Sequence, residues 1–212
     1  MLIYAVADIH ADSKRLDRIG ENITTHCPDV LVIAGDIINY IKPSPVFKFL
    51  NTLPVPVLAV RGNSDPLYVE KRFKNYSNLT SLHLNRVMIQ SVPFAGLSGT
   101  IPLPFRNRVC FREKRLMDKI SPLIDRQTIL VVHPPPRGVL DQVLGRFHSG
   151  SKMVRDLVDK TQPRILICGH IHEAAGKAKI KDTVVINCSI PGNGHGMMIE
   201  LGEQGDPTII NV

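Results

Sequence analysis

The sequence predicts an α/β domain, and two observations carry the prediction. Short apolar segments rich in valine and isoleucine alternate with amphipathic stretches along the 212-residue chain, and this alternation is typical of α/β proteins. No internal repeat, low-complexity tract or linker-like segment interrupts the pattern. Residues 1–212 are therefore predicted to form a single domain, which is long enough to bury a core without disulfides or structural metals.

The predicted elements follow from the spacing of the apolar residues. Leu16, Ile19 and Ile23 recur at helical spacing behind Asp12, a residue type that caps helices. Helices are predicted at 13–25, 45–52, 66–76, 111–121 and 151–160, and strands at 2–7, 30–34, 55–60, 128–132, 164–168 and 183–187. Two antiparallel features complete the set, a hairpin over 82–98 that turns near Asn85 and a final pair of strands at 196–200 and 207–212.

The composition narrows the class of protein. The net charge of +7 fits an anionic substrate or a nucleic acid. The four cysteines lie far apart and form no C-x-x-C pair, so neither a disulfide framework nor a thiolate zinc site is predicted. No apolar stretch is long enough to span a bilayer, and the opening MLIYAVADIH lacks the basic start of a signal peptide. We therefore expect a cytoplasmic protein without a membrane partner, and its oligomeric state stays open.

Polar side chains of metal-binding types follow five of the predicted strands. The carboxyl ends of strands in an α/β sheet form the edge at which sites are built, so we expect these side chains to meet. They are Asp8 and His10 after the first strand, Asp36 after the second, Asn63 after the third, His133 after ILVV, and His170 and His172 after ILIC.

Each of these motifs alone has an ordinary structural explanation. A Gly-Asp or Gly-Asn pair is usually a turn, and a lone histidine after a strand is usually a hydrogen-bonded structural residue. The repetition at five strand ends favours a metal site over a set of separate turns. Imidazole and carboxylate ligands without thiolate favour manganese, with iron, zinc or nickel as alternatives, over the oxygen cages of magnesium and calcium.

The order D-x-H, G-D, G-N-x-D, H and G-H-x-H, from residue 8 to about residue 190, resembles that of the calcineurin-like metallophosphoesterases. The stretch 148–176 is also similar to a small-phosphodiesterase branch of that family. The resemblance implies a four-layer α/β/β/α sandwich, in which two mixed β-sheets are flanked by helices. It further implies two divalent metal ions about 4 Å apart, with a bridging hydroxide that attacks the phosphorus in line. By the same resemblance, Asp8, His10 and His172 hold the first ion, Asn63, His133 and His170 hold the second, and Asp36 bridges them.

One position departs from the family pattern. Many members carry a histidine directly after the metal-binding asparagine, where it protonates the leaving oxygen, and this chain carries Ser64. The departure favours diester substrates over monoesters. Asp36 and Asn63 are the predicted catalytic residues at the metals, and Asn63 and Ser64 are predicted to contact substrate. Asp65 is expected to cap the following helix or to support a ligand.

Two further histidines are candidates for the missing acid. His148 precedes the helix predicted at 151–160, where Ser149 and Gly150 are expected to help cradle a phosphate oxygen through backbone N–H groups. The alternative is an ordinary N-cap turn beside a surface histidine. His195 lies in a glycine-rich turn, for which a plain hairpin turn is the alternative. His148 is the predicted third catalytic residue and, with Ser149 and Gly150, a predicted substrate contact.

The predicted function is metal-dependent hydrolysis of a small or nucleotide-like phosphodiester. Two alternatives remain open at this point, a non-catalytic metal-binding scaffold of the same fold and a nuclease. The basic cluster RNRVCFREKR at 106–115, within a rim segment at 93–125, is the sequence feature that points to nucleic acid. A small phosphorylated substrate is therefore favoured as partner over nucleic acid.

Overall fold

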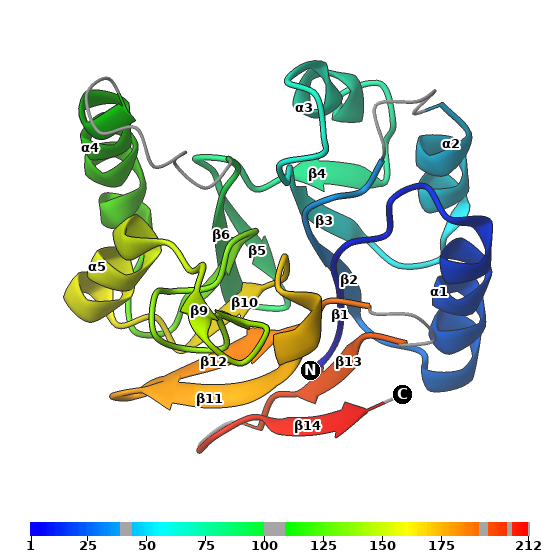
Figure 1. The fold of residues 1–212 in the computed structure, drawn as a ribbon. Helices are drawn as coiled ribbons and strands as arrows, with labels where there is room; N and C mark the ends of the chain where they lie inside the picture. The colour runs from blue at the N-terminus through cyan, green and yellow to red at the C-terminus, as the bar shows by residue number, and fades with distance from the viewer. Residues whose placement is uncertain (39–43, 100–108, 191–194, 203–204, 212) are drawn as a thin grey trace.

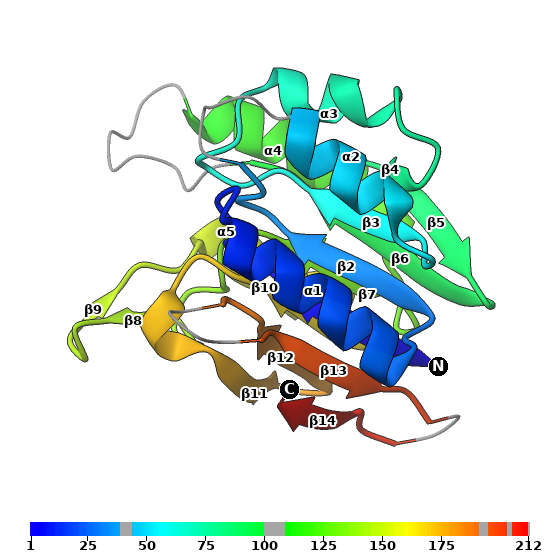
Figure 2. The ribbon, with the colours of Figure 1, turned by 90° about the vertical axis from the view of Figure 1, so that its right-hand side faces the viewer.

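The computed structural model describes residues 1–38, 44–99, 109–190, 195–202 and 205–211. Two six-stranded mixed sheets pack face to face (Figures 1 and 2). The predicted four-layer sandwich is therefore confirmed.

The first sheet has the strand order β14-β13-β1-β2-β3-β4. Its parallel strands are β1 (Leu2–Val6), β2 (Val30–Ala34), β3 (Val57–Val60) and β4 (Leu79–Ser81). The chain end adds β13 (Met197–Glu200) and β14 (Thr208–Asn211) as the predicted antiparallel pair.

The second sheet has the strand order β11-β12-β10-β7-β6-β5. Its parallel strands are β6 (Val92–Leu97), β7 (Ile129–Val132), β10 (Ile165–Cys168) and β12 (Thr183–Asn187). The two edge strands, β5 (Arg86–Ile89) and β11 (Gly176–Ile180), are antiparallel to their neighbours.

The helices cover the outer faces of the two sheets (Figure 1). The first sheet carries α1 (Ser13–His26), α2 (Ser44–Thr52) and α3 (Tyr68–Phe73), whose apolar side chains share one buried cluster with it. The second carries α4 (Val109–Ile120) and α5 (Lys152–Thr161). A 3-10 turn (Ser121–Leu123) extends α4. None of the helices within the described ranges is both long and apolar enough to cross a membrane.

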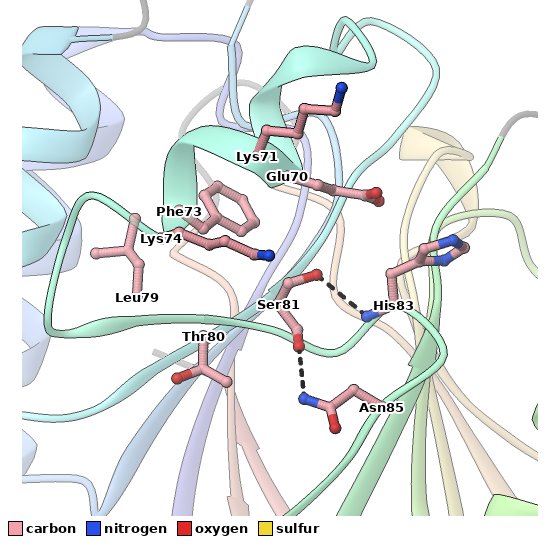
Figure 3. A pocket seen from close by; sticks show the side chains of 9 residues that line it. All are labelled: Glu70, Lys71, Phe73, Lys74, Leu79, Thr80, Ser81, His83 and Asn85. Carbon is pink, nitrogen blue, oxygen red and sulfur yellow. Dashed lines mark hydrogen bonds between the residues drawn. The ribbon is translucent and has the colours of Figure 1, made fainter.

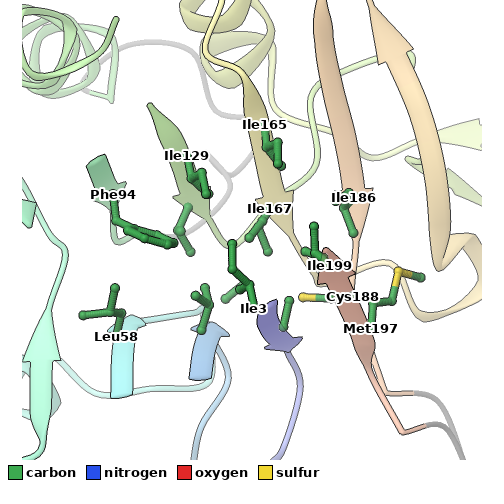
Figure 4. Close-up of a cluster of buried hydrophobic side chains, with 14 of the residues drawn as sticks. Ile3, Leu58, Phe94, Ile129, Ile165, Ile167, Ile186, Cys188, Met197 and Ile199 are labelled. Atoms are coloured by element: carbon green, nitrogen blue, oxygen red, sulfur yellow. The ribbon is translucent and has the colours of Figure 1, made fainter. Parts of the chain in front are cut away.

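The central core lies between the sheets and follows from the two-residue period of the strands. Ile3 and Ala5 of β1 belong to the inter-sheet cluster, whereas Tyr4 and Val6 pack toward the helices. Strands buried on both faces have no polar side to present, which explains why the sequence shows continuous apolar runs at these positions. The inter-sheet side chains, which include Leu58, Ile129, Ile165 and Ile186, interdigitate in Figure 4.

Three sequence expectations need correction. The hairpin turns at Gln90 and Ser91, not near Asn85, because both residues adopt the left-handed conformation of a two-residue hairpin turn without glycine. The helix predicted at 66–76 is shorter, since α3 covers Tyr68–Phe73. Strands β4 and β11 and the small hairpin of β8 (Gln142–Val143) and β9 (Phe147–His148) were not predicted. Part of the rim segment and of its basic cluster, residues 100–108, lies outside the described residues.

Candidate metal centre

The five strands that precede the predicted ligands end at one edge of the sandwich. β1, β2 and β3 are parallel neighbours in the first sheet, and β7 and β10 are parallel neighbours in the second. The two sheets join at this edge, where Ala7 pairs with Ser189 and its N–H donates to the carbonyl of Cys188 at 3.1 Å. The carboxyl ends of both sheets therefore point toward a shared site.

Asp8 and Asp36 are the buried centre of this site. Ligand atoms of Asp8, His10 and His172 lie within 4.8 Å of one another, as do those of Asp8, Asp36 and His133. Asp36 Oδ2 lies 3.8 Å from His10 Nε2 and 3.5 Å from His133 Nε2. Asp36 thus stands between histidines that the sequence assigned to different metals.

The remaining two predicted ligands lie around His133. Its Nε2 is 2.9 Å from Asn63 Oδ1 and 3.2 Å from His170 Nδ1. On the other side of the site, His172 Nε2 is 3.4 Å from Asp8 Oδ1, and the His10 and His172 rings are 6.1 Å apart. All seven predicted side chains are therefore brought together by the fold.

The chemistry of this donor set fits a divalent cation. Asp8 Oδ1 is buried and has no hydrogen-bond partner among the described residues, and a buried oxygen without a partner costs free energy. His133 Nδ1 lies 2.8 Å from the Ala34 carbonyl, which can only accept, so the ring proton sits on Nδ1. The bare Nε2 then faces Asp36 and Asn63, as in metal-binding histidines that are oriented by a backbone carbonyl.

The backbone around the carboxylates is strained in a way that brings them close. Asp8, His10, Asp36 and His170 adopt left-handed conformations, with φ of 62°, 54°, 54° and 72°. Such conformations cost free energy for residues with a side chain and cluster at functional sites. A side chain at Gly62 would collide with the Asp36 carboxylate, which explains the glycine before Asn63.

Asp65 holds the loops that carry two of the predicted ligands. Its buried carboxylate accepts hydrogen bonds from the N–H groups of Ile37 at 3.1 Å, Ile38 at 2.8 Å and Gly62 at 2.9 Å. These amides directly follow Asp36 and directly precede Asn63. Asp65 therefore supports ligands, one of the two roles expected for it.

Ser64 is used to hold Asp36. Its backbone N–H donates to Asp36 Oδ1 at 2.8 Å and its hydroxyl to Oδ2 at 2.9 Å. If Ser64 contacts substrate as predicted, its hydroxyl can only accept, because its one proton is donated to Asp36.

The prediction that backbone N–H groups before α5 bind a phosphate oxygen is wrong. The N–H of Ser149 donates to the Asp141 carbonyl at 2.9 Å, and that of Gly150 to Asp141 Oδ2 at 3.0 Å. Ser151 caps the helix by accepting from Val154 N–H. The alternative of an ordinary capped turn is therefore correct for 149–151, since these amides have no proton left for an anion. Nothing in the sequence singled out Asp141.

His148 lies on β9, and its Nδ1 is 2.7 Å from Asp141 Oδ1. The second candidate histidine, His195, is anchored through its backbone carbonyl. That carbonyl accepts from the Tyr4 hydroxyl and, at 3.3 Å, from Asn22 Nδ2. The backbone at His195 is therefore held against β1 and α1.

The site favours a charged Asp8 and a neutral His170. Burial would raise the pKa of Asp8, but its contacts with the neighbouring His172 and His133 imidazoles outweigh this effect and lower the pKa to about 2. Burial and the neighbouring His133 lower the pKa of His170 to about 4. The Asp8 carboxylate raises the pKa of His172. Deprotonated carboxylates and imidazoles are the forms that bind cations.

We expect the metal-free protein to lose stability as the pH falls from 6.5 to about 4. The unfolded chain takes up a proton on His170 near pH 6.5, whereas the folded chain does so near pH 4. This difference lowers the free energy of unfolding by about 3 kcal/mol across that window. The raised pKa of His172 acts in the opposite direction, so the comparison should be made with His170→Asn. Urea unfolding in the presence of chelator measures the free energy of unfolding of the wild type and of His170→Asn at each pH. If this free energy depends on pH equally in the two proteins, the effect does not come from His170.

The described residues also form a pocket of about 530 Å³ between α3 and β4 (Figure 3). Its lining includes Glu70, Lys74, Ser81 and His83, and none of the seven predicted ligands. His83 Nδ1 accepts the Ser98 N–H at 3.1 Å, so this histidine is engaged in the wall of the pocket. The pocket is therefore separate from the candidate metal centre.

Known proteins share sequence or fold with this chain. A Methanocaldococcus jannaschii protein described as uncharacterized is 28% identical over 89% of this chain and 88% of its own length. A UPF0046 protein of Caenorhabditis elegans is 30% identical over 82% of this chain and 67% of its own length. The crystal structure of a Thermus thermophilus protein superposes with a TM-score of 0.72 at 15% identity, covering 99% of this chain and 98% of that one.

The family model of the calcineurin-like phosphoesterases matches residues 1–174, which include all seven side chains of the candidate metal centre. The resemblance drawn from the sequence motifs is thereby confirmed. The chain belongs to the calcineurin-like phosphoesterase family.

Proposed function

We propose that this protein is a metal-dependent phosphodiesterase that binds two divalent cations, with manganese favoured, and hydrolyses a small or nucleotide-like phosphodiester. In this proposal, Asp8, His10 and His172 hold one cation and Asn63, His133 and His170 the other. Asp36 bridges the two. The observation that carries the proposal is the place of Asp36 Oδ2, within 3.8 Å of His10 Nε2 and 3.5 Å of His133 Nε2.

The residues of the chain supply a preorganised and partly dry site. His133 is fully buried and Asp36 almost so, whereas the His172 side chain is 42% exposed. Substrate therefore approaches from the side of His172, and the buried side keeps the ligands fixed. Two cations bound there would neutralise phosphoryl charge and activate the attacking water. Ser64, through its two hydrogen bonds, holds the Asp36 carboxylate in the orientation that bridging requires.

Two features support an anionic diester as substrate. The net charge of +7 attracts anions. Ser64 has no imidazole to protonate a poor leaving group, and its hydroxyl already donates to Asp36. We also propose a cytoplasmic location, because the cysteines are widely spaced in the sequence and suggest no disulfide framework. The oligomeric state stays open.

We expect hydrolysis of bis-p-nitrophenyl phosphate to require added Mn²⁺, to exceed that of p-nitrophenyl phosphate, and to fall by roughly a hundredfold or more after chelation. Both substrates release the same chromophore, so their rates compare directly. Metal content is measured on the same samples. Bound metal without turnover of either substrate would contradict the enzyme and indicate the scaffold. Preference for the monoester would contradict the diesterase alone.

A further inference from the structure

The β8–β9 hairpin is held between two segments that carry predicted ligands. It begins shortly after His133, and its base is closed by Ser151, whose N–H donates to the Pro135 carbonyl at 2.8 Å. Near its tip, the Leu144 N–H donates to Glu173 Oε2 at 2.8 Å, on the 3-10 turn that contains His172. Figure 2 shows the hairpin on the side toward which β2 runs. The hairpin therefore stands at the same edge as the metal centre.

Asp141 and His148 form a carboxylate–imidazole pair within this hairpin. Asp141 is only 1% exposed, and its Oδ1 lies 2.7 Å from His148 Nδ1. Its Oδ2 accepts the N–H groups of Gly138 at 2.9 Å and Gly150 at 3.0 Å. A side chain at Gly150 would place a carbon 2.7 Å from Asp141 Oδ2, so the turn is built around this carboxylate.

Asp141 contacts His148 through Nδ1, so the second ring nitrogen, Nε2, is not used by this pair. Burial raises the pKa of Asp141, but the hydrogen bonds from His148, Gly138 and Gly150 outweigh it and lower that pKa. A charged Asp141 accepts the proton on His148 Nδ1 and thereby orients the ring. The His148 side chain is 43% exposed, so the imidazole is accessible from solvent.

We propose that His148 donates a proton to the leaving-group oxygen and that Asp141 is the positioning residue that orients it. This inference rests on the phosphodiesterase function proposed above. The oxygen of the attacking water forms a bond to phosphorus, the bond between phosphorus and the leaving oxygen breaks, and its electron pair goes to the leaving oxygen. The oxygen takes the proton from His148 Nε2, and the imidazole, then neutral, regains a proton from water. Ser64 does not fill this role, because its hydroxyl donates to Asp36.

The test compares leaving groups in the manganese-loaded protein of 212 residues. Proton donation matters little for p-nitrophenolate and much for phenolate, which is the stronger base. We expect His148→Ala to lower kcat for phenyl phosphodiesters about 100-fold more than for p-nitrophenyl phosphodiesters. We expect Asp141→Asn, which keeps the side-chain volume, to show the same selectivity with a smaller loss and little change in KM. His26→Ala, at an exposed histidine that ends α1, is the matched control and should change neither rate.

The possible outcomes distinguish a failure of this inference from a failure of the proposed phosphodiesterase function. Equal losses on both substrates, or none, in a metal-dependent wild-type enzyme would overturn the roles of His148 and Asp141 and leave the phosphodiesterase intact. Absence of wild-type hydrolysis with metal bound would overturn both. Circular dichroism of each variant checks that the hairpin change has not unfolded the domain, and a folded Asp141→Asn without leaving-group selectivity would reject Asp141 as a positioning residue.

Discussion

Replacing Asp36 with asparagine is expected to abolish tight binding of both cations and to lower metal-dependent phosphodiester hydrolysis by roughly a thousandfold or more. Asp36 is 3% exposed and stands between His10 and His133, which the proposal assigns to different metals. An amide offers one neutral oxygen in place of a shared charge. Removal of the bridge therefore affects both cations, in contrast to the loss of a ligand that serves one.

The measurement is metal content by elemental analysis together with kcat for bis-p-nitrophenyl phosphate. Asp182→Asn is the matched control, because it makes the same chemical change at a side chain that is 82% exposed. It should retain both metals and full turnover. An Asp36→Asn protein with two equivalents of metal and wild-type turnover would refute the bridging role. Asparagine is preferred to alanine here because it keeps an acceptor for the Ser64 N–H, which otherwise loses its partner.

Replacing Asp65 with alanine is expected to lower the free energy of unfolding by about 4 kcal/mol. The buried carboxylate accepts three backbone N–H groups, from Ile37, Ile38 and Gly62, and alanine leaves all three without a partner. Part of this stabilisation is already offset in the wild type, because burial and the charge of Asp36 raise the pKa of Asp65. The loops after β2 and β3 should also separate, so the affinity for metal falls with stability.

Urea unfolding at pH 7 in chelator measures the first effect, and metal titration of the folded variant measures the second. Asp65→Asn should lower the free energy of unfolding by an intermediate amount. Its side-chain oxygen accepts some of these hydrogen bonds, whereas its amide N–H faces another backbone N–H and repels it. Asp182→Ala is the control for removal of a carboxylate and should lie within about 0.5 kcal/mol of the wild type. A loss below about 1 kcal/mol for Asp65→Ala would show that the loops hold their positions by other contacts.

Much of the fold and of the ligand set could be predicted from the sequence because the signals are local. Each predicted ligand lies within four residues of the end of a continuous apolar run. Such a run becomes a buried strand wherever it is placed in the sheet. The parallel arrangement then brings Asp8, Asp36 and Asn63 to one edge. The motif order also carried the resemblance to the phosphoesterase family, which the family comparison confirms.

The details that decide the roles of individual side chains depended on the tertiary structure. Ser64 is a candidate substrate contact by its place in the motif, yet its partner is Asp36, 28 residues away. Ser149 and Gly150 look like an anion cradle until Asp141 is seen to accept their protons. A hydrogen-bond donor binds whichever acceptor the fold brings within about 3 Å, and sequence patterns do not report that approach. The sequence by itself determined the strands and the order of the ligands, whereas the packing of distant loops decided which of the remaining polar groups stay available for chemistry.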